Sequence, residues 1–186
     1  MRTRVVIDML VLFAFAVSLL AGCAKGRSVA DLMGALKSPD PKVRFEAAKA
    51  LGELGSNAAK AAPDLTEALN DSEAKVRHAA ARALGKIGPA GKEAISSLTK
   101  ALSDTDPRVR HSAAIALGRF GTDSKEALSN LIPLLKDKDP KIRQAAARTL
   151  GKIGPDAKQA ADALKNALND KNPQVREAAS NALKRI

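Results

Sequence analysis

The sequence predicts an all-α fold in which one two-helix unit of 33 residues occurs five times. A Val-Arg or Ile-Arg pair recurs every 33 residues, at positions 43–44, 76–77, 109–110, 142–143 and 175–176. Alanine occupies 37 of the 186 positions, and Trp and Tyr are absent, so the core must come from close packing of small helical residues. Nine prolines and twelve glycines predict that these helices are short. The single cysteine excludes a disulfide framework.

The second helix of each unit has recognisable start and stop signals. It follows an Asp-Pro or Asn-Pro pair in four units, where the acidic or amide side chain can cap the helix and Pro can occupy its first turn. In the second unit the corresponding pair is Glu73-Ala74, a weaker helix-start signal. In the first unit the apolar stripe runs through Val43, Ala47, Leu51 and Leu54, the spacing of a buried helical face. Four of these helices reach a glycine that is expected to form a left-handed cap: Gly55, Gly88, Gly121 and Gly154.

The first helix of each unit is predicted from leucines four residues apart. The pairs share one offset in all five units: Leu32 and Leu36, Leu65 and Leu69, Leu98 and Leu102, Leu131 and Leu135, Leu164 and Leu168. A second set of glycines falls inside the second helices, where glycine costs about 1 kcal/mol relative to alanine. We expect close approach of neighbouring helices to compensate at these positions: Gly52, Gly85, Gly118 and Gly151.

The first 23 residues have the organisation of an export signal. Arg2 and Arg4 precede an apolar stretch at residues 9–21, which at 1.5 Å per residue spans about 20 Å, less than the roughly 30 Å of a bilayer core. The stretch ends in Leu20-Ala21-Gly22-Cys23, which resembles the bacterial lipobox. That resemblance implies cleavage before Cys23 and a diacylglycerol on its thiol; the alternatives are an uncleaved anchor or a buried apolar helix.

The expected organisation therefore has three parts: a lipoprotein signal peptide at residues 1–22, the lipidated Cys23 with a tether at residues 23–27, and the repeat array at residues 28–186. A lipid anchor predicts location in the bacterial cell envelope, on the periplasmic side of the outer membrane if the cell is Gram-negative.

The repeat unit reads L-x-x-x-L-x-D-x-D-P-x-V-R-x-x-A-A-x-A-L-G-x-I-G, most closely at residues 104–110 and 137–143. Over about residues 26–186 it resembles the short HEAT repeat, in the subgroup shared with phycobilin-lyase-like proteins. The resemblance implies a right-handed α-solenoid whose second helices line the concave side. It also implies that the recurring arginines bridge to aspartates of neighbouring units rather than bind phosphate or carboxylate ligands. The expected structural ladder comprises Arg44, Arg77, Arg110, Arg143 and Arg176 with Asp40, Asp106 and Asp139.

Positions outside the buried stripe of the second helices vary between units, as expected for a recognition face. Three rows run along the array: residues 45, 78, 111, 144 and 177; residues 49, 82, 115, 148 and 181; and residues 53, 86, 119, 152 and 185. Basic residues are concentrated in the middle units, and the formal net charge of +11 favours acidic partners. The alternative is a solvated charged face. The candidate partner-binding residues are His78, Arg82, Lys86, His111, Arg119, Arg148 and Lys152.

The sequence offers little for catalysis. His78 and His111 occupy equivalent positions in adjacent units, but further ligands for a closed zinc site are missing around them, and no catalytic motif occurs. We therefore expect neither enzymatic activity nor a cofactor nor a metal. The predicted function is a membrane-anchored, non-enzymatic scaffold that presents a basic concave face to an acidic protein or peptide. The resemblance also suggests bilin-lyase-like chromophore attachment or assembly, and charge suggests binding to an anionic lipid surface. Nucleic acid is not an expected partner of an exported chain.

Overall fold

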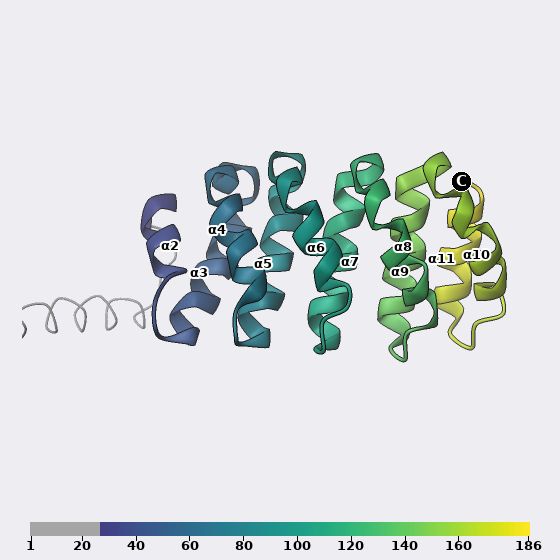
Figure 1. Ribbon diagram of the computed structural model, residues 1–186, viewed down its shortest axis with the longest axis horizontal. Helices are drawn as coiled ribbons and strands as arrows, with labels where there is room; N and C mark the ends of the chain where they lie inside the picture. Colours follow the sequence, from purple (N-terminus) through teal and green to yellow (C-terminus); the bar gives the residue numbers. More distant parts are fainter. Residues whose placement is uncertain (1–26) are drawn as a thin grey trace, which may run out of the picture.

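The computed structural model describes residues 27–186, which form a row of stacked helix pairs without a β-strand in that range (Figure 1). The prediction of an all-α repeat array is confirmed. One layer consists of the second helices of the repeats, each packed on the next: α3 (Pro41–Leu54), α5 (Ala74–Ile87), α7 (Pro107–Phe120), α9 (Pro140–Ile153) and α11 (Pro173–Leu183). These are the longest helices of the described part of the chain.

The other layer is less regular than the sequence indicated, because its helices are divided. The α-helical pieces are α2 (Val29–Ala35), α4 (Ala62–Glu67), α6 (Ile95–Ala101), α8 (Leu128–Leu131) and α10 (Ala161–Ala167). Short 3₁₀ helices precede or follow them: η2 (Gly55–Ala61), η3 (Ala68–Asn70), η4 (Gly88–Ala94), η5 (Gly121–Ala127), η6 (Pro133–Lys136) and η7 (Gly154–Ala160). At Gly91, φ of −106° and ψ of 19° mark a kink inside η4.

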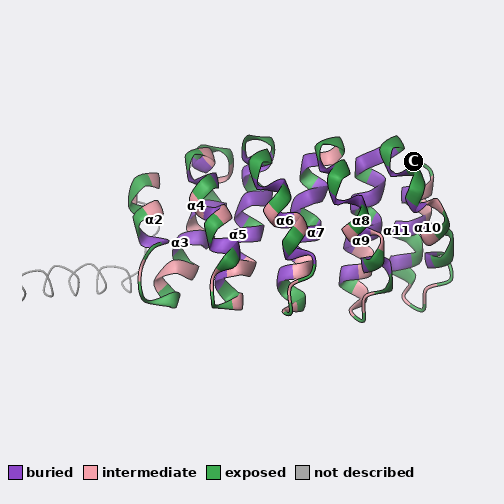
Figure 2. Ribbon diagram, in the orientation of Figure 1, coloured by how far each residue is buried: buried purple, intermediate pink, exposed green. Residues whose placement is uncertain are grey.

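The core lies between the two layers and continues from repeat to repeat (Figure 2). In the second helices, Leu51, Leu84, Leu117 and Leu150 are fully buried. In the other layer, the leucines at positions 32, 65, 98, 131 and 164 are at most 2% exposed. Burial of one leucine contributes about 1.5–3 kcal/mol, so the 33-residue period places a comparable contribution in every repeat.

The glycines that end the second helices adopt a conformation different from the expected left-handed helical cap. Gly55 has φ of 56°, as a cap requires, but its ψ is −131° rather than positive. Gly88, Gly121 and Gly154 have the same combination of signs. This region of backbone space is essentially restricted to glycine, and here it turns the chain sharply from one layer into the next 3₁₀ helix.

The interior glycines permit close helix contact, as expected. A Cβ placed on Gly151 of α9 would lie 2.8 Å from the Cα atom of Ala182 on α11, too close for the backbones to remain in place. The second helices therefore approach one another nearly backbone to backbone. This brings the outward side chains of neighbouring repeats together on one face.

The predicted signal peptide and Cys23 lie outside the described residues. Within residues 27–186, no helix combines the length and apolar character needed to span a bilayer.

Candidate functional site

Four arginines join each repeat to the next through paired hydrogen bonds to an aspartate 27 residues later. The Nε-to-Oδ2 distances are 2.6 Å for Arg44–Asp71, 2.7 Å for Arg77–Asp104, 2.9 Å for Arg110–Asp137 and 2.7 Å for Arg143–Asp170. In each pair Nη2 also donates to Oδ1, so the contact is bidentate. We call these four pairs the Arg–Asp ladder.

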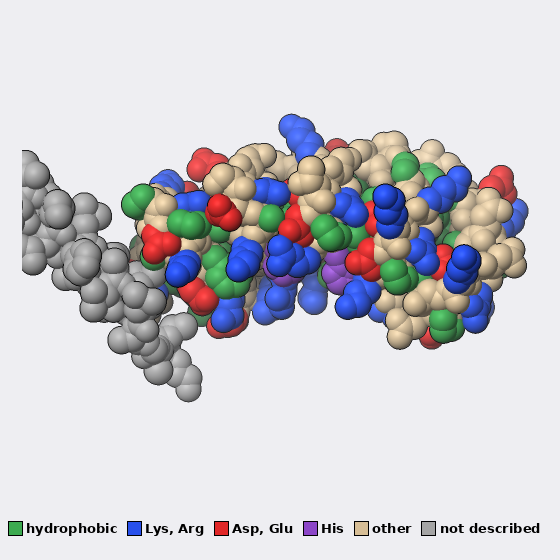
Figure 3. Space-filling view, turned by 90° about the horizontal axis from the view of Figure 1, so that it is seen from below, with side chains coloured by type: hydrophobic (Ala, Val, Ile, Leu, Met, Phe, Trp, Pro, Cys, Tyr) green, Lys and Arg blue, Asp and Glu red, His purple; other side chains and the backbone are tan. Residues whose placement is uncertain are grey.

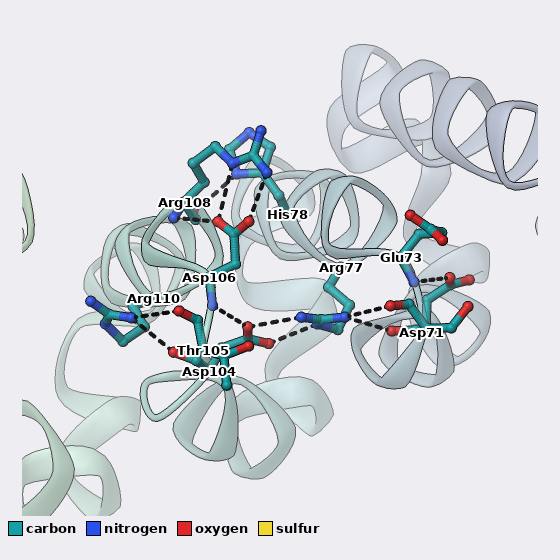
Figure 4. A network of polar contacts seen from close by, with 10 residues as sticks. Asp71, Glu73, Arg77, His78, Asp104, Thr105, Asp106, Arg108 and Arg110 are labelled. Atoms are coloured by element: carbon teal, nitrogen blue, oxygen red, sulfur yellow. Dashed lines mark hydrogen bonds and ion pairs between the residues drawn. The ribbon is translucent and has the colours of Figure 1, made fainter.

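The ladder leaves little capacity for binding a ligand. Besides pairing with Asp104, Arg77 donates from Nη1 to the carbonyl oxygens of Asp71 and Ser72 at 2.8 and 3.1 Å (Figure 4). Asp104 in turn accepts the backbone N–H of Asp106 at 2.8 Å. The two side chains are only 15% and 11% exposed. These contacts indicate that the guanidinium groups connect repeats and hold the loop before each second helix.

The aspartates of the ladder differ from those that the sequence suggested. Asp40, Asp106 and Asp139 cap the second helices instead, accepting the N–H of the residue two positions later at 2.8 Å. The unit contains two aspartates in D-x-D-P, and only the first lies in the loop that the arginine of the preceding repeat reaches. One sequence signal distinguishes them: the first aspartate recurs in four units but is Ser38 in the first, which has no preceding repeat arginine to pair with.

Arg176 keeps the same local contacts, and within residues 27–186 it makes no ion pair with an aspartate of another repeat. Its Nη1 atom donates to the carbonyl oxygens of Asp170 and Lys171 at 2.8 and 3.2 Å.

The ladder also shifts the pKa of its carboxyl groups. The hydrogen bond from Arg44 lowers the pKa of Asp71, against an opposing effect of burial. For Asp104, burial acts to raise the pKa, but the hydrogen bonds from Arg77 and from the Asp106 N–H together lower it. At the cap, hydrogen bonds from the Arg108 side chain and backbone lower the pKa of Asp106 to about 2. All three carboxyl groups are therefore held in the charged form near neutral pH.

The candidate partner-binding residues lie on the outward face of the second helices, away from the ladder. The seven candidate partner-binding residues line consecutive grooves between neighbouring helices. The groove between α5 and α7 has a volume of about 410 Å³ and is lined by His78, Arg82, Lys86, His111 and Arg119. The groove between α7 and α9 has about 160 Å³ and includes His111, Arg148 and Lys152.

Five cations on this surface, Arg82, Lys86, Arg119, Arg148 and Lys152, are exposed, and we call them the basic face. No ion pair found within residues 27–186 involves any of the five. Figure 3 shows Lys and Arg side chains around histidine near the middle of one side of the array. Uncompensated like charges on adjacent helices raise the local positive potential, which attracts anionic groups.

The two histidines differ in their surroundings. His78 Nδ1 lies 3.0 Å from the carbonyl oxygen of Arg108 and 2.8 Å from Ser112 Oγ, which ties α5 to α7 (Figure 4 shows His78 beside Arg108). The tautomer decides which contact is a hydrogen bond: a protonated Nδ1 donates to the Arg108 carbonyl, whereas an unprotonated Nδ1 accepts from the Ser112 hydroxyl. Burial lowers the pKa of His111, and nearby Lys141 and His78 act in the same direction while Asp139 opposes them. In the described part of the chain, no group of three or more potential ligands could hold a metal ion.

The sequence pattern does not single out two residues of this surface, Ser112 and Ile115. Ser112 occupies a position that is alanine in the units before and after it, and its buried hydroxyl contacts His78. Ile115 belongs to an outward row but not to the candidate binding residues, yet it lines the grooves on both sides of α7. A single serine or isoleucine carries no functional pattern by itself; comparison of the five units at one offset would have identified both.

Solved structures include several similar repeat arrays. The complex of CpcE and CpcF of phycocyanin lyase from Nostoc sp. PCC7120 contains a chain that is 28% identical, with a TM-score of 0.77; the match covers 88% of this chain and 66% of that one. A designed armadillo repeat protein in complex with the peptide (KR)4 is 23% identical, with a TM-score of 0.75 and coverage of 84% and 80%. An engineered protein is 27% identical, with a TM-score of 0.68 and coverage of 84% and 78%.

No curated protein matches the sequence. The family model for HEAT repeats matches residues 12–73, 62–131 and 121–184, which together span most of the sequence. The helix pairs, the shared 33-residue period and this match agree, and the chain belongs to the HEAT-repeat family.

Proposed function

We propose that this protein is a non-enzymatic, membrane-anchored scaffold whose basic face binds an acidic protein or peptide segment. The observation that carries the proposal is the contrast in charge pairing: the ladder arginines are neutralised by aspartates, whereas the five cations of the basic face have no ion-pair partner within residues 27–186. Cations gathered along successive grooves suit a ligand that is itself extended and carries several negative charges.

The basic face is tested by binding of a synthetic deca-glutamate peptide, followed by fluorescence anisotropy with the full chain in neutral detergent. Arg82→Glu with Arg148→Glu should abolish most of the binding. The matched control is Lys60→Glu with Lys158→Glu, because these exposed lysines lie on η2 and η7 in the other layer. Both double variants lower the formal net charge from +11 to +7, so bulk charge is held constant.

Three outcomes are informative. Selective loss in the first double variant supports the basic face. If both double variants lose peptide binding equally, overall charge rather than the basic face accounts for the binding. If the peptide fails to bind, and anionic but not zwitterionic phospholipid vesicles recruit the Cys23→Ser protein, the surface recognises lipid headgroups instead.

Membrane anchoring forms the second part of the proposal and depends on Leu20-Ala21-Gly22-Cys23. Cys23→Ser should prevent incorporation of a labelled fatty acid and leave the precursor at its full mass. Equal labelling of the variant and the unmodified sequence would contradict a lipid on Cys23.

A second candidate function is suggested by the similarity to a chain of the CpcE–CpcF phycocyanin lyase complex. If this protein attached or carried a bilin, co-expression with the pigment and an acceptor protein would give a covalent visible absorbance. We favour the scaffold because an exported chain would not meet a cytosolic assembly pathway, and because a common fold does not transfer an activity.

A further inference from the structure

Ile115 interrupts the basic face at its centre. The side chain is 41% exposed, and with Leu54 and Leu168 it is one of three exposed large apolar side chains in residues 27–186. At the same offset the neighbouring units carry Arg82 and Arg148, and the outer units carry Lys49 and Asn181. Four of the five units thus have a polar residue where the central unit presents isoleucine.

Ile115 lies where a ligand on the basic face would contact it. Its side chain lines both the α5–α7 groove and the α7–α9 groove, so it stands on the ridge between them. Small residues form the buried floor on either side: Ala81, Gly85 and Ala116 in one groove and Ala145 in the other. Because these small residues have almost no exposed surface, Ile115 supplies the exposed apolar contact in the middle of a surface whose walls are cationic.

An exposed isoleucine alone would need no explanation, because soluble proteins expose many apolar atoms. Here, however, the isoleucine occupies an offset at which both neighbouring units carry an arginine that an acidic ligand can pair with. A ligand with a large apolar side chain at this point would bury that side chain against Ile115. Its acidic residues would meet Arg82 and Lys86 on one side and Arg148 and Lys152 on the other.

Resting on the proposed function, we infer that the basic face recognises an acidic segment with one large apolar side chain between its acidic residues. The charges provide attraction that salt weakens, whereas the apolar contact selects the segment and is much less sensitive to salt. Charge complementarity on both sides of a single apolar position distinguishes this ligand from a plain polyanion.

Three eleven-residue probes test the inference in the same anisotropy assay. One contains only glutamate, one has leucine at its central position, and one has leucine at its first position. The central-leucine probe should bind roughly fivefold to tenfold more tightly than the all-glutamate probe, the effect of burying part of a leucine side chain. The first-position probe should show little or none of this advantage, and the preference should persist as added salt weakens all three.

The matched variant is Ile115→Arg, which installs the residue present at positions 82 and 148. Because position 115 is exposed, circular dichroism should show an unchanged helical array. The variant should bind the all-glutamate probe more tightly than the original protein does and lose the preference for central leucine. Equal binding of all three probes to the original protein, or a preference that survives Ile115→Arg, would overturn the apolar contact while leaving the acidic ligand intact. If no probe binds, the proposed function itself fails.

Discussion

The Arg–Asp ladder and the basic face lie on the same second helices but in opposite electrostatic settings. On α5, Arg77 and Arg82 are five residues apart, which turns them about 140° from one another around the helix. Arg77 is mostly buried and bonded to Asp104, whereas Arg82 is exposed and has no ion-pair partner among the described residues. The same residue type thus connects repeats on one side and remains available to a ligand on the other.

This difference also explains at which positions the same residue type recurs in every unit. The ladder recurs because each of its pairs spans a boundary between units, and a missing aspartate leaves a mostly buried guanidinium without its carboxylate. The outward rows that contain residues 49 and 53 are exposed in all five units, and their residues change from one unit to the next. Stability and recognition can therefore be perturbed separately, which the following variants test.

The largest effect is expected in the core on which both regions depend. Leu102→Ala should lower the free energy of unfolding by about 2–5 kcal/mol, because Leu102 is 1% exposed and its removal leaves a cavity. Lys100→Ala, two residues away and exposed, should change it by no more than about 0.5 kcal/mol. Chemical denaturation followed by circular dichroism gives both values. Equal effects would mean that α6 presents a different face to the core.

The ladder should give the next largest effect. Asp104→Ala should lower the free energy of unfolding by about 2–4 kcal/mol, since it leaves the mostly buried Arg77 without a carboxylate and removes the acceptor of the Asp106 N–H. The control is Asp162→Ala, whose pair with Lys165 is exposed on both sides and should contribute little. The same denaturation assay compares them. Similar small losses would show that the ladder pairs are no stronger than ordinary surface pairs.

Acid should weaken the ladder and the caps without a mutation. The folded protein lowers the pKa of Asp71, Asp104 and Asp106. Their contribution to stability is therefore complete above the unfolded value of about 3.9 and is lost as the pH falls through the folded values, which for Asp106 is about 2. Unfolding midpoints should fall steeply between about pH 4 and pH 2. Asp104→Ala should make the unfolding midpoint fall less steeply with decreasing pH. If the midpoint falls as steeply in the variant, other groups cause the acid sensitivity.

The sequence predicted the array and the gathering of the basic residues because both depend on period alone. Residues at equal offsets of a 33-residue repeat must align once the helices stack, so Arg82 and Arg148 could be placed on one face without coordinates. The ladder partners could not be placed in this way, because Asp104 and Asp106 are two residues apart and only the loop path decides which one Arg77 reaches. The same holds for Ser112, whose contact with His78 depends on the separation of α5 and α7.

The smallest change in stability is expected on the basic face. Arg82→Gln with Arg148→Gln should alter the free energy of unfolding by no more than about 0.5 kcal/mol, because both side chains are exposed and lack an ion-pair partner within residues 27–186. The sign should be stabilising at low salt, since the substitution removes repulsion among the remaining cations, and the difference should vanish as salt screens them. Denaturation at two ionic strengths measures this directly, and binding of the deca-glutamate peptide to the same variant should fall. A loss of more than about 1 kcal/mol would assign these arginines a structural role like that of Arg77 and erase the distinction between the two regions.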